Sequence, residues 1–326
     1  MENNSFRSVY PVIKSSFTLD HESRILSLGS CFSEHIGNRL KLYGFRVVLN
    51  PFGILYNPIS IASNLQRAMN YRLFDSSDLV HRDSLWHCFD FHGLFSRLDK
   101  EQCLEKINDA LQTASKAIEK VQVVLLTFGT AWAFRLKKSN KIVANCHKFP
   151  HADFERILLN PEEIITCWGK LLEAWLAVNP NIKILISISP VRYLRDGFHG
   201  NNLGKASLHL ALQELVKQFE NIVYFPAYEL VTDDLRDYRF YEKDRSHPNT
   251  EAVDYVWERF QKVYLSDSAG EIIDKLQQIQ DRLNHRPLHE SPDQHGGRMQ
   301  KAKAELADLQ KHYPALDLSM LEDIAG

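Results

Sequence analysis

The stretch from Arg24 to Leu42 constrains the fold of this chain more than any other. It is a short apolar strand, Arg-Ile-Leu-Ser-Leu, that stops at Gly29 and turns directly into an amphipathic helix. The first backbone N–H groups of such a helix have no intrahelical partner, so the turn is a ready site for negative charge. Ser30 and Cys31 stand at this turn, and each is a candidate nucleophile. They also fit a structural role, with Ser30 as a helix cap and Cys31 as a small buried hydrophobe.

Apolar and amphipathic segments alternate along the chain after this turn. Strands are predicted at residues 24–28, 45–49, 121–129, 182–188 and 222–225, and helices at 30–43, 59–69, 100–120, 161–178, 203–219 and 250–264. This alternation predicts an α/β fold with an open parallel sheet covered on both faces. Ligands of such folds bind outside the carboxyl ends of the strands.

Three segments depart from this pattern. Residues 79–95 form an aromatic-rich alternating run and residues 132–144 turn at Lys138-Ser139-Asn140, so both are predicted to be β-hairpin insertions. Beyond Leu265 the sequence becomes charged and helical, with helices predicted at 271–286 and 300–312 and a connection at 287–297. We therefore predict a main domain at 1–265 and a helical extension at 266–326. The extension either packs on the main domain or serves as an oligomerisation arm.

Composition excludes several classes of function. The chain of 326 residues has a formal net charge of −2, whereas a nucleic-acid binder normally shows a basic excess. Its first residues lack the apolar core of a signal peptide, and no later apolar run approaches the ~18 residues that span a bilayer. We expect a cytoplasmic protein with no nucleic-acid or membrane partner. Its 5 cysteines are odd in number and have no paired spacing, which predicts free thiols.

A second candidate for chemistry follows the last predicted strand. Asp244 and His247 form a D-x-x-H pair just before a helix, in the sequence Asp-Arg-Ser-His-Pro-Asn. At this spacing the carboxylate can accept a hydrogen bond from one ring nitrogen and leave the other free to act as a base. In a parallel sheet the pair should lie at the same edge as Ser30 and Cys31. A surface pair of this kind is, by itself, more often merely solvated.

No cofactor or metal site is predicted. The sequence contains no phosphate-binding loop. Residue types that zinc uses occur at Cys146, His147 and His151, and at His87 and Cys88, but no second C-x-x-C or H-x-x-x-H element accompanies them.

Six motifs in order resemble those of the GSCFA domain family, which is grouped with the SGNH (GDSL-like) hydrolases. The resemblance covers roughly residues 24–260. The motifs are Gly29-Ser30-Cys31-Phe32-Ser33, Asn50-Pro51-Phe52-Gly53, Thr127-Phe128-Gly129-Thr130, Asn145-Cys146-His147-Lys148, Ser189-Pro190-Val191-Arg192 and Asp244 to Pro248.

The resemblance implies a flavodoxin-like three-layer sandwich and acyl-ester chemistry. The nucleophile would follow the first strand, His247 would move the proton, and Asp244 would orient His247. Gly53 would match a glycine whose N–H contributes to the oxyanion hole. The superfamily's G-x-N-D block reads Gly129-Thr130-Ala131-Trp132 here, so its asparagine is missing, and either Asn145 or Asn50 would replace it.

The position of the nucleophile stays open between two residues. Aligning Gly29-Ser30-Cys31-Phe32 with G-D-S-L without a gap places Cys31 at the nucleophile, and a shift by one residue places Ser30 there. We favour Cys31 slightly, and expect it to ionise more easily than a free thiol because it begins a helix near His247. Arg192, in the loop after the fourth strand, is a candidate for gripping substrate.

The predicted function is that of an esterase or acyltransferase that acts on an O-acylated small molecule or glycan. The alternative is a binding or scaffold protein that keeps a degenerate SGNH fold, and the absence of the asparagine at Ala131 favours it. A homo-oligomer would form through the C-terminal helices.

Overall fold

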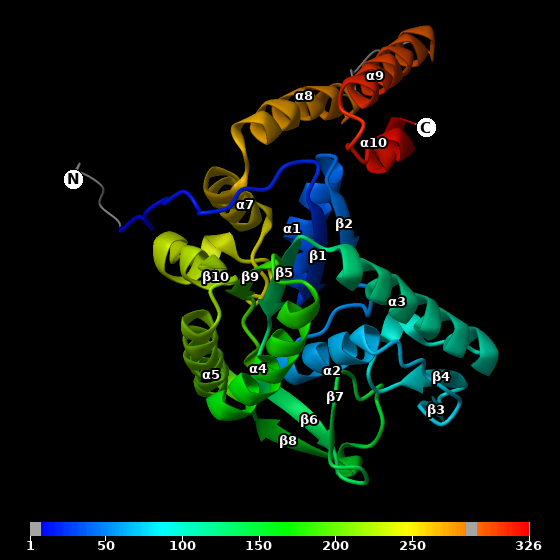
Figure 1. The fold of residues 1–326 in the computed structure, drawn as a ribbon, viewed down its shortest axis with the longest axis vertical. Coiled ribbons are helices and arrows are strands. Elements are labelled where there is room, and N and C mark those ends of the chain that lie inside the picture. The colour runs from blue at the N-terminus through cyan, green and yellow to red at the C-terminus, as the bar shows by residue number, and fades with distance from the viewer. Residues whose placement is uncertain (1–7, 285–291, 326) are drawn as a thin grey trace.

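A five-stranded parallel sheet forms the centre of the molecule (Figure 1). The computed structural model describes residues 8–284 and 292–325. The strands are β1 (Arg24–Gly29), β2 (Arg46–Leu49), β5 (Val123–Phe128), β9 (Lys183–Ile188) and β10 (Ile222–Phe225), in the order β10-β9-β5-β1-β2. Counted along the chain, this is the 2-1-3-4-5 order of flavodoxin-like sheets, so the predicted fold class is confirmed.

The sheet is buried on both faces, which explains its nearly continuous apolar strands. Along β5, Val124, Leu126 and Phe128 point to one face, while Val123 and Leu125 point to the other. The first face is covered by α2 (Pro58–Met69), α3 (Lys100–Lys120), α4 (Pro161–Val178) and α5 (Gly197–Gln218). The second is covered by α1 (Cys31–Leu42) and α7 (Thr250–Tyr264).

Antiparallel strands are inserted at two places. One hairpin pairs β3 (Leu79–Arg82) with β4 (Leu85–Cys88), and its two turn residues, Asp83 and Ser84, both have positive φ, as a tight hairpin turn requires. The other insertion is a three-stranded sheet of β6 (Trp132–Leu136), β7 (Lys141–Val143) and β8 (Phe154–Leu158), in the order β7-β6-β8. Both predicted hairpins are present, but the third strand of the second insertion was not predicted.

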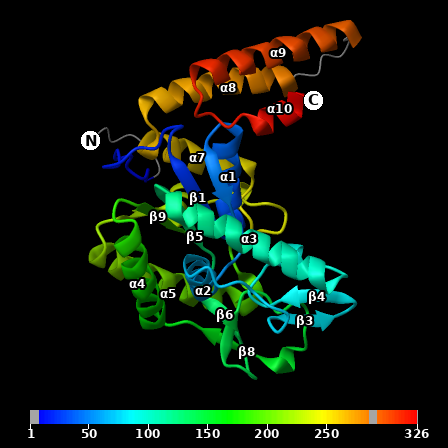
Figure 2. The same ribbon diagram turned by 45° about the vertical axis from the view of Figure 1, so that its right-hand side comes forward.

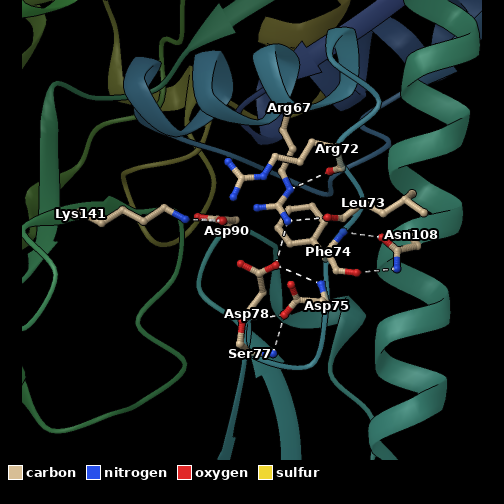
Figure 3. A network of polar contacts seen from close by, with 10 residues as sticks. All are labelled: Arg67, Arg72, Leu73, Phe74, Asp75, Ser77, Asp78, Asp90, Asn108 and Lys141. Atoms are coloured by element: carbon tan, nitrogen blue, oxygen red, sulfur yellow. Dashed lines mark hydrogen bonds and ion pairs between the residues drawn. The ribbon is translucent and has the colours of Figure 1, made fainter.

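A polar network fixes the first insertion between α2 and α3 (Figure 3). Arg67 of α2 donates to Asp78 at 2.8 Å and to the carbonyl of Leu73 at 2.7 Å, and its guanidinium lies 3.5 Å from the centroid of the Phe74 ring. Asn108 of α3 exchanges two hydrogen bonds with the backbone of Phe74. The chain between α2 and β3 is therefore held at both ends.

The C-terminal helices lie at the end of the molecule opposite β6–β8 (Figure 2). They are α8 (Asp267–Asn284), α9 (Pro292–His312) and α10 (Ser319–Ala325), and α8 and α9 lie side by side. Leu276 and Leu306 are buried in the same apolar cluster as α1 and α7. Of the predicted elements, residues 285–286 of the helix and 287–291 of the connection lie outside the described residues, and α9 begins earlier than predicted.

Helix α5 also begins earlier than predicted, because tertiary packing overrides its glycines. Gly200 and Gly204 lie in the helix, and a Cβ on Gly204 would come within 3.1 Å of the Trp132 ring. These glycines allow α5 to approach β6 closely.

Several short helical turns complete the chain. These are α6 (Ala227–Glu229), a π-helical turn (Leu230–Leu235) and 3₁₀ turns at Gly93–Phe95, His151–Asp153, Leu194–Asp196 and Tyr238–Phe240. In the described part of the chain, no helix is both long and apolar enough to cross a membrane.

Candidate active site

The turn between β1 and α1 can be made only with glycine at position 29. Gly29 has a φ of +135°, and a Cβ there would lie 2.1 Å from the carbonyl oxygen of Thr127 on β5. The next residue, Ser30, donates its N–H to that carbonyl at 3.0 Å and is fully buried. Ser30 occupies the N-cap position, but its hydroxyl makes no capping hydrogen bond, so the predicted capping role is wrong.

Cys31 is the first residue of α1, and it lines a cleft of about 980 Å³. Its sulfur lies beside its own backbone N–H and that of Phe32, which favour the thiolate. Burial and the Glu34 carboxylate outweigh these groups, so the pKa of the Cys31 thiol is raised. The expectation that Cys31 ionises more easily than a free thiol is therefore wrong.

The Asp244–His247 pair lines the same cleft. Asp244 Oδ2 lies 2.6 Å from His247 Nδ1, while Oδ1 accepts the backbone N–H groups of Ser246 at 2.8 Å and His247 at 3.0 Å. These bonds, the His247 N–H first among them, hold the pKa of Asp244 well below its usual range. With Nδ1 engaged by the carboxylate, Nε2 is left as the nitrogen that can accept a proton.

The loop carrying this pair is tied to its neighbours. The backbone N–H of Glu242 donates to the His247 carbonyl at 2.7 Å, and the backbone N–H of Arg192 donates to the Ser246 carbonyl at 3.0 Å. Asn249 caps α7 by accepting a hydrogen bond from the N–H of Ala252. The loops after β9 and before α7 therefore form one connected rim.

Two of the other predicted site residues line the cleft. Asn145 does so from the loop after β7, and its Oδ1 accepts the N–H of His147 at 2.8 Å. Among the described residues, none accepts a hydrogen bond from its Nδ2. Arg192 lies at the rim with its guanidinium 5.1 Å from the Phe198 ring and 5.5 Å from the Tyr238 ring.

The remaining predicted residues support the site from behind. Asn50 Oδ1 accepts the Gly29 N–H at 2.9 Å, so its amide braces the turn. The Gly53 N–H donates to the Asn50 carbonyl at 2.7 Å and is not available to an oxyanion. A Cβ on Gly53 would lie 2.4 Å from His92 Cβ, which accounts for a glycine at this position. Gly129 is buried, and its N–H donates a hydrogen bond to the backbone carbonyl of Tyr56.

A buried lysine lies behind Cys31 and was not predicted. Lys205 of α5 is 3% exposed and donates to the carbonyls of Gly129 at 2.7 Å and Ser189 at 2.6 Å. These carbonyls follow β5 and β9, so the lysine joins the carboxyl ends of two central strands. Burial lowers the pKa of Lys205 to about 7, against a smaller opposing effect of Cys31. A sequence signal existed, because Lys205 shares one helical face with Leu208, Leu212 and Leu215.

Two tyrosines also surround Cys31. Their rings, Tyr56 and Tyr193, meet edge to face with centroids 5.6 Å apart. Burial raises the pKa of Tyr193 well above its usual range. Its hydroxyl lies beside the hydroxyls of Ser30 and Ser189, which oppose that shift, although no hydrogen bond of good geometry joins it to either.

Three of the zinc-type residues noted in the sequence, His147, His87 and Cys88, contact one another. His147 Nε2 lies 2.7 Å from the Cys88 carbonyl, and the His87 and His147 rings lie 4.7 Å apart. Among the described residues, no group of three or more His, Cys, Asp or Glu side chains is arranged to hold a metal.

The fold and the cleft define an α/β protein with a candidate ligand site at the carboxyl edge of a flavodoxin-like sheet. Cys31 and Thr130 of the cleft follow β1 and β5, the two strands between which the strand order reverses. The chain belongs to the GSCFA family, whose family model matches residues 24–260.

Comparison with other proteins adds little about chemistry. No curated protein sequence matches the chain. Among solved structures, the crystal structure of a carbohydrate esterase family 3 protein from Talaromyces cellulolyticus covers 78% of this chain and 99% of that chain, at 10% identity and a TM-score of 0.38. A likeness at this level carries no argument about the activity.

Proposed function

We propose that this protein is an esterase or acyltransferase of the SGNH type, with Cys31 as nucleophile, His247 as proton carrier and Asp244 as the residue that orients His247. One observation carries the proposal. A thiol at a helix N-terminus and a carboxylate-bound histidine, from opposite ends of the sheet domain's sequence, line one cleft at the carboxyl edge of the sheet.

Burial supports Cys31 over Ser30 as the nucleophile. Ser30 is fully buried and does not line the cleft, whereas Cys31 is only partly buried and does. An acyl ester in the cleft therefore meets the thiol. Because the pKa of Cys31 is raised, the thiol holds its proton at neutral pH, and His247 must remove that proton as the sulfur attacks.

The first half of the reaction forms a thioester. His247 Nε2 takes the proton of Cys31, the sulfur bonds to the acyl carbon, and the carbonyl oxygen becomes an oxyanion. The N–H groups of Cys31 and Phe32 at the start of α1, together with Asn145 Nδ2, are the donors we assign to that oxyanion. The C–O bond to the leaving alcohol then breaks, and the alcohol oxygen takes the proton from His247.

The second half regenerates the thiol. Water, or the hydroxyl of a second substrate, gives its proton to His247 and attacks the thioester carbon. The C–S bond breaks and the sulfur recovers the proton. With water the product is a carboxylic acid, and with a hydroxyl it is a new ester. The substrate class is an O-acylated small molecule or glycan, for which a cleft of about 980 Å³ has room.

The test is a panel of activated acetyl esters, scored for a burst of leaving group and for an acylated protein by intact mass. Cys31→Ala should abolish both signals. Cys146→Ala is the matched control, because this second thiol lines the same cleft without a role in the mechanism. Likewise His247→Ala should remove turnover, with His151→Ala, another histidine of the cleft, as its control. Full activity in Cys31→Ala would refute the mechanism.

A non-catalytic binding protein is the second candidate, and Ala131 favours it. Ala131 stands at the place of the superfamily asparagine and is fully buried, so this position presents no side-chain donor to an oxyanion. A folded protein with neither turnover nor labelling of Cys31 by iodoacetamide would support this candidate over the enzyme.

A further inference from the structure

Basic side chains gather where the antiparallel sheet forms a wall of the cleft. Lys148, Arg156 and Arg195 line it there, from the loop after β7, from β8 and from the turn after β9. Both guanidinium groups pack on the ring of Phe134, at 4.6 Å for Arg156 and 4.9 Å for Arg195. Since the whole chain has a net charge of −2, this gathering of cations is local.

These cations differ in their partners. Arg156 is held by Asp196 in a two-pronged ion pair, with nitrogen–oxygen distances of 3.1 and 2.6 Å. In the described parts of the chain, neither Arg195 nor Lys148 pairs with a carboxylate, and Lys148 is exposed with a φ of +59°. Asp244 is the one carboxylate among the described lining residues, and it is bonded to His247. Of the three cations on this wall, Arg195 and Lys148 are therefore left for a ligand, while Arg192 at the rim bonds to the Tyr238 hydroxyl and the Arg245 carbonyl.

The positive charges of Arg195 and Arg156 influence a thiol inside the cleft. Burial raises the pKa of Cys146 to about 11, and Arg195 and Arg156 oppose that rise. The Cys146 thiol is thus a position inside the cleft where a negative charge would be stabilised by both side chains. Trp132 and Phe134 supply an apolar wall beside it, which strengthens charge pairing by excluding water.

We infer that this end of the cleft is a subsite for an anionic group, a carboxylate or a phosphate, on the ester that Cys31 attacks. The inference rests on the proposed function and names its substrate class as anionic acyl esters. Arg195 and Lys148 bind the anion, while Arg156, neutralised by Asp196, orients Phe134 beneath it. A planar guanidinium suits either oxyanion through paired N–H donors.

The test compares three acetyl esters that share a phenyl acetate core and differ in the para substituent: phenyl acetate, 4-acetoxybenzoate and 4-acetoxyphenyl phosphate. The measured quantity is kcat/KM for each anionic ester divided by kcat/KM for phenyl acetate. We expect this ratio to fall about tenfold in Arg195→Gln and in Lys148→Gln, the loss typical of one charge-assisted hydrogen bond. Comparing ratios between proteins cancels the intrinsic reactivity of each ester. Lys138→Gln, an exposed lysine on the β6–β7 turn outside the cleft, should keep the wild-type ratio.

Calorimetric titration with phenyl phosphate, and with phenol as the neutral control, measures the subsite without turnover. The two anionic esters show whether carboxylate or phosphate is preferred. Turnover with ratios that the two variants leave unchanged would overturn the subsite and leave the proposed function standing. No turnover, with phenyl phosphate bound by the wild type and not by Arg195→Gln, would overturn the enzyme and keep the subsite. Neither turnover nor binding would overturn both.

Discussion

Replacing Lys205 by Met tests the most unusual electrostatic feature of the fold. Burial lowers the pKa of Lys205 from 10.5 to about 7 in the folded protein. Between these values the unfolded chain holds a proton that the folded protein does not, so the free energy of unfolding rises with pH. The slope approaches about 1.4 kcal/mol per pH unit, and the gain from pH 7 to pH 9 is about 2 kcal/mol. Well below pH 7 both states hold the proton and this term is constant.

The substitution separates the contribution of Lys205 to the pH dependence of stability from the contributions of the other titrating groups. Lys205→Met keeps a similar volume but leaves the carbonyls of Gly129 and Ser189 without their donor, a cost of about 1–3 kcal/mol for each that is the same at both pH values. Cysteines and tyrosines titrate in both proteins and cancel in the difference, except for the coupling between Lys205 and Cys31, which belongs to the Lys205 term. Only the pH-dependent part of the difference therefore reports on Lys205.

The assay is urea unfolding of both proteins at pH 7 and pH 9. The stability of the wild type relative to Lys205→Met should rise by about 2 kcal/mol over this interval. Lys205→Gln, whose amide can still donate to a carbonyl, provides a second comparison if the methionine variant is too unstable. Equal differences at the two pH values would mean that Lys205 keeps its proton throughout, and would refute the reasoning.

Three further predictions concern the turn, the extension and the thiol. Gly29→Ala should prevent folding, because its Cβ would lie 2.1 Å from a backbone oxygen. Gly169 on α4 is the control: its Cβ would enter open space, so Gly169→Ala should raise the urea midpoint and increase the free energy of unfolding by about 0.5–1 kcal/mol. Leu306→Ala should cost about 2–5 kcal/mol in the same assay, because Leu306 is 1% exposed where α9 packs; a smaller loss would show that the extension is loosely attached. Glu34→Gln should speed iodoacetamide alkylation of Cys31 at neutral pH by lowering its pKa, and an unchanged rate would contradict the assigned cause.

The sheet was predictable because its signals are local and repeated. An apolar run such as residues 121–129 leaves few alternatives to a buried strand, and Gly29 marks the end of the first strand unambiguously. Helix α5 shows the limit of this reasoning. Gly197 and Gly200 weaken the helical signal before residue 203, yet Gly200 and Gly204 lie against Trp132 in the helix, a packing that only the tertiary structure reveals.

The sequence predicted which residues lie together at the candidate site better than it predicted the role of each residue. Parallel topology alone places the segments of Cys31 and His247 at one edge of the sheet. The hydrogen bonds of Asn50 and Gly53 depend on how one loop folds under the turn, which no spacing encodes. The pKa of Cys31 depends on its burial, which a helix-terminus argument leaves out.

The buried Lys205 and the partly buried Cys31 at the centre of the proposed site influence each other. A protonated Lys205 lowers the pKa of Cys31, and a Cys31 thiolate raises the pKa of Lys205. Because Lys205 titrates near pH 7, its charge depends on the state of the sulfur. When His247 removes the proton from Cys31 in the proposed mechanism, the thiolate raises the pKa of Lys205. When the thioester later breaks down, the positive charge of Lys205 stabilises the departing thiolate of Cys31. The raised pKa of the resting thiol and the lowered pKa of the resting lysine have the same origin, two ionisable groups desolvated together, and both shifts diminish when both groups are charged.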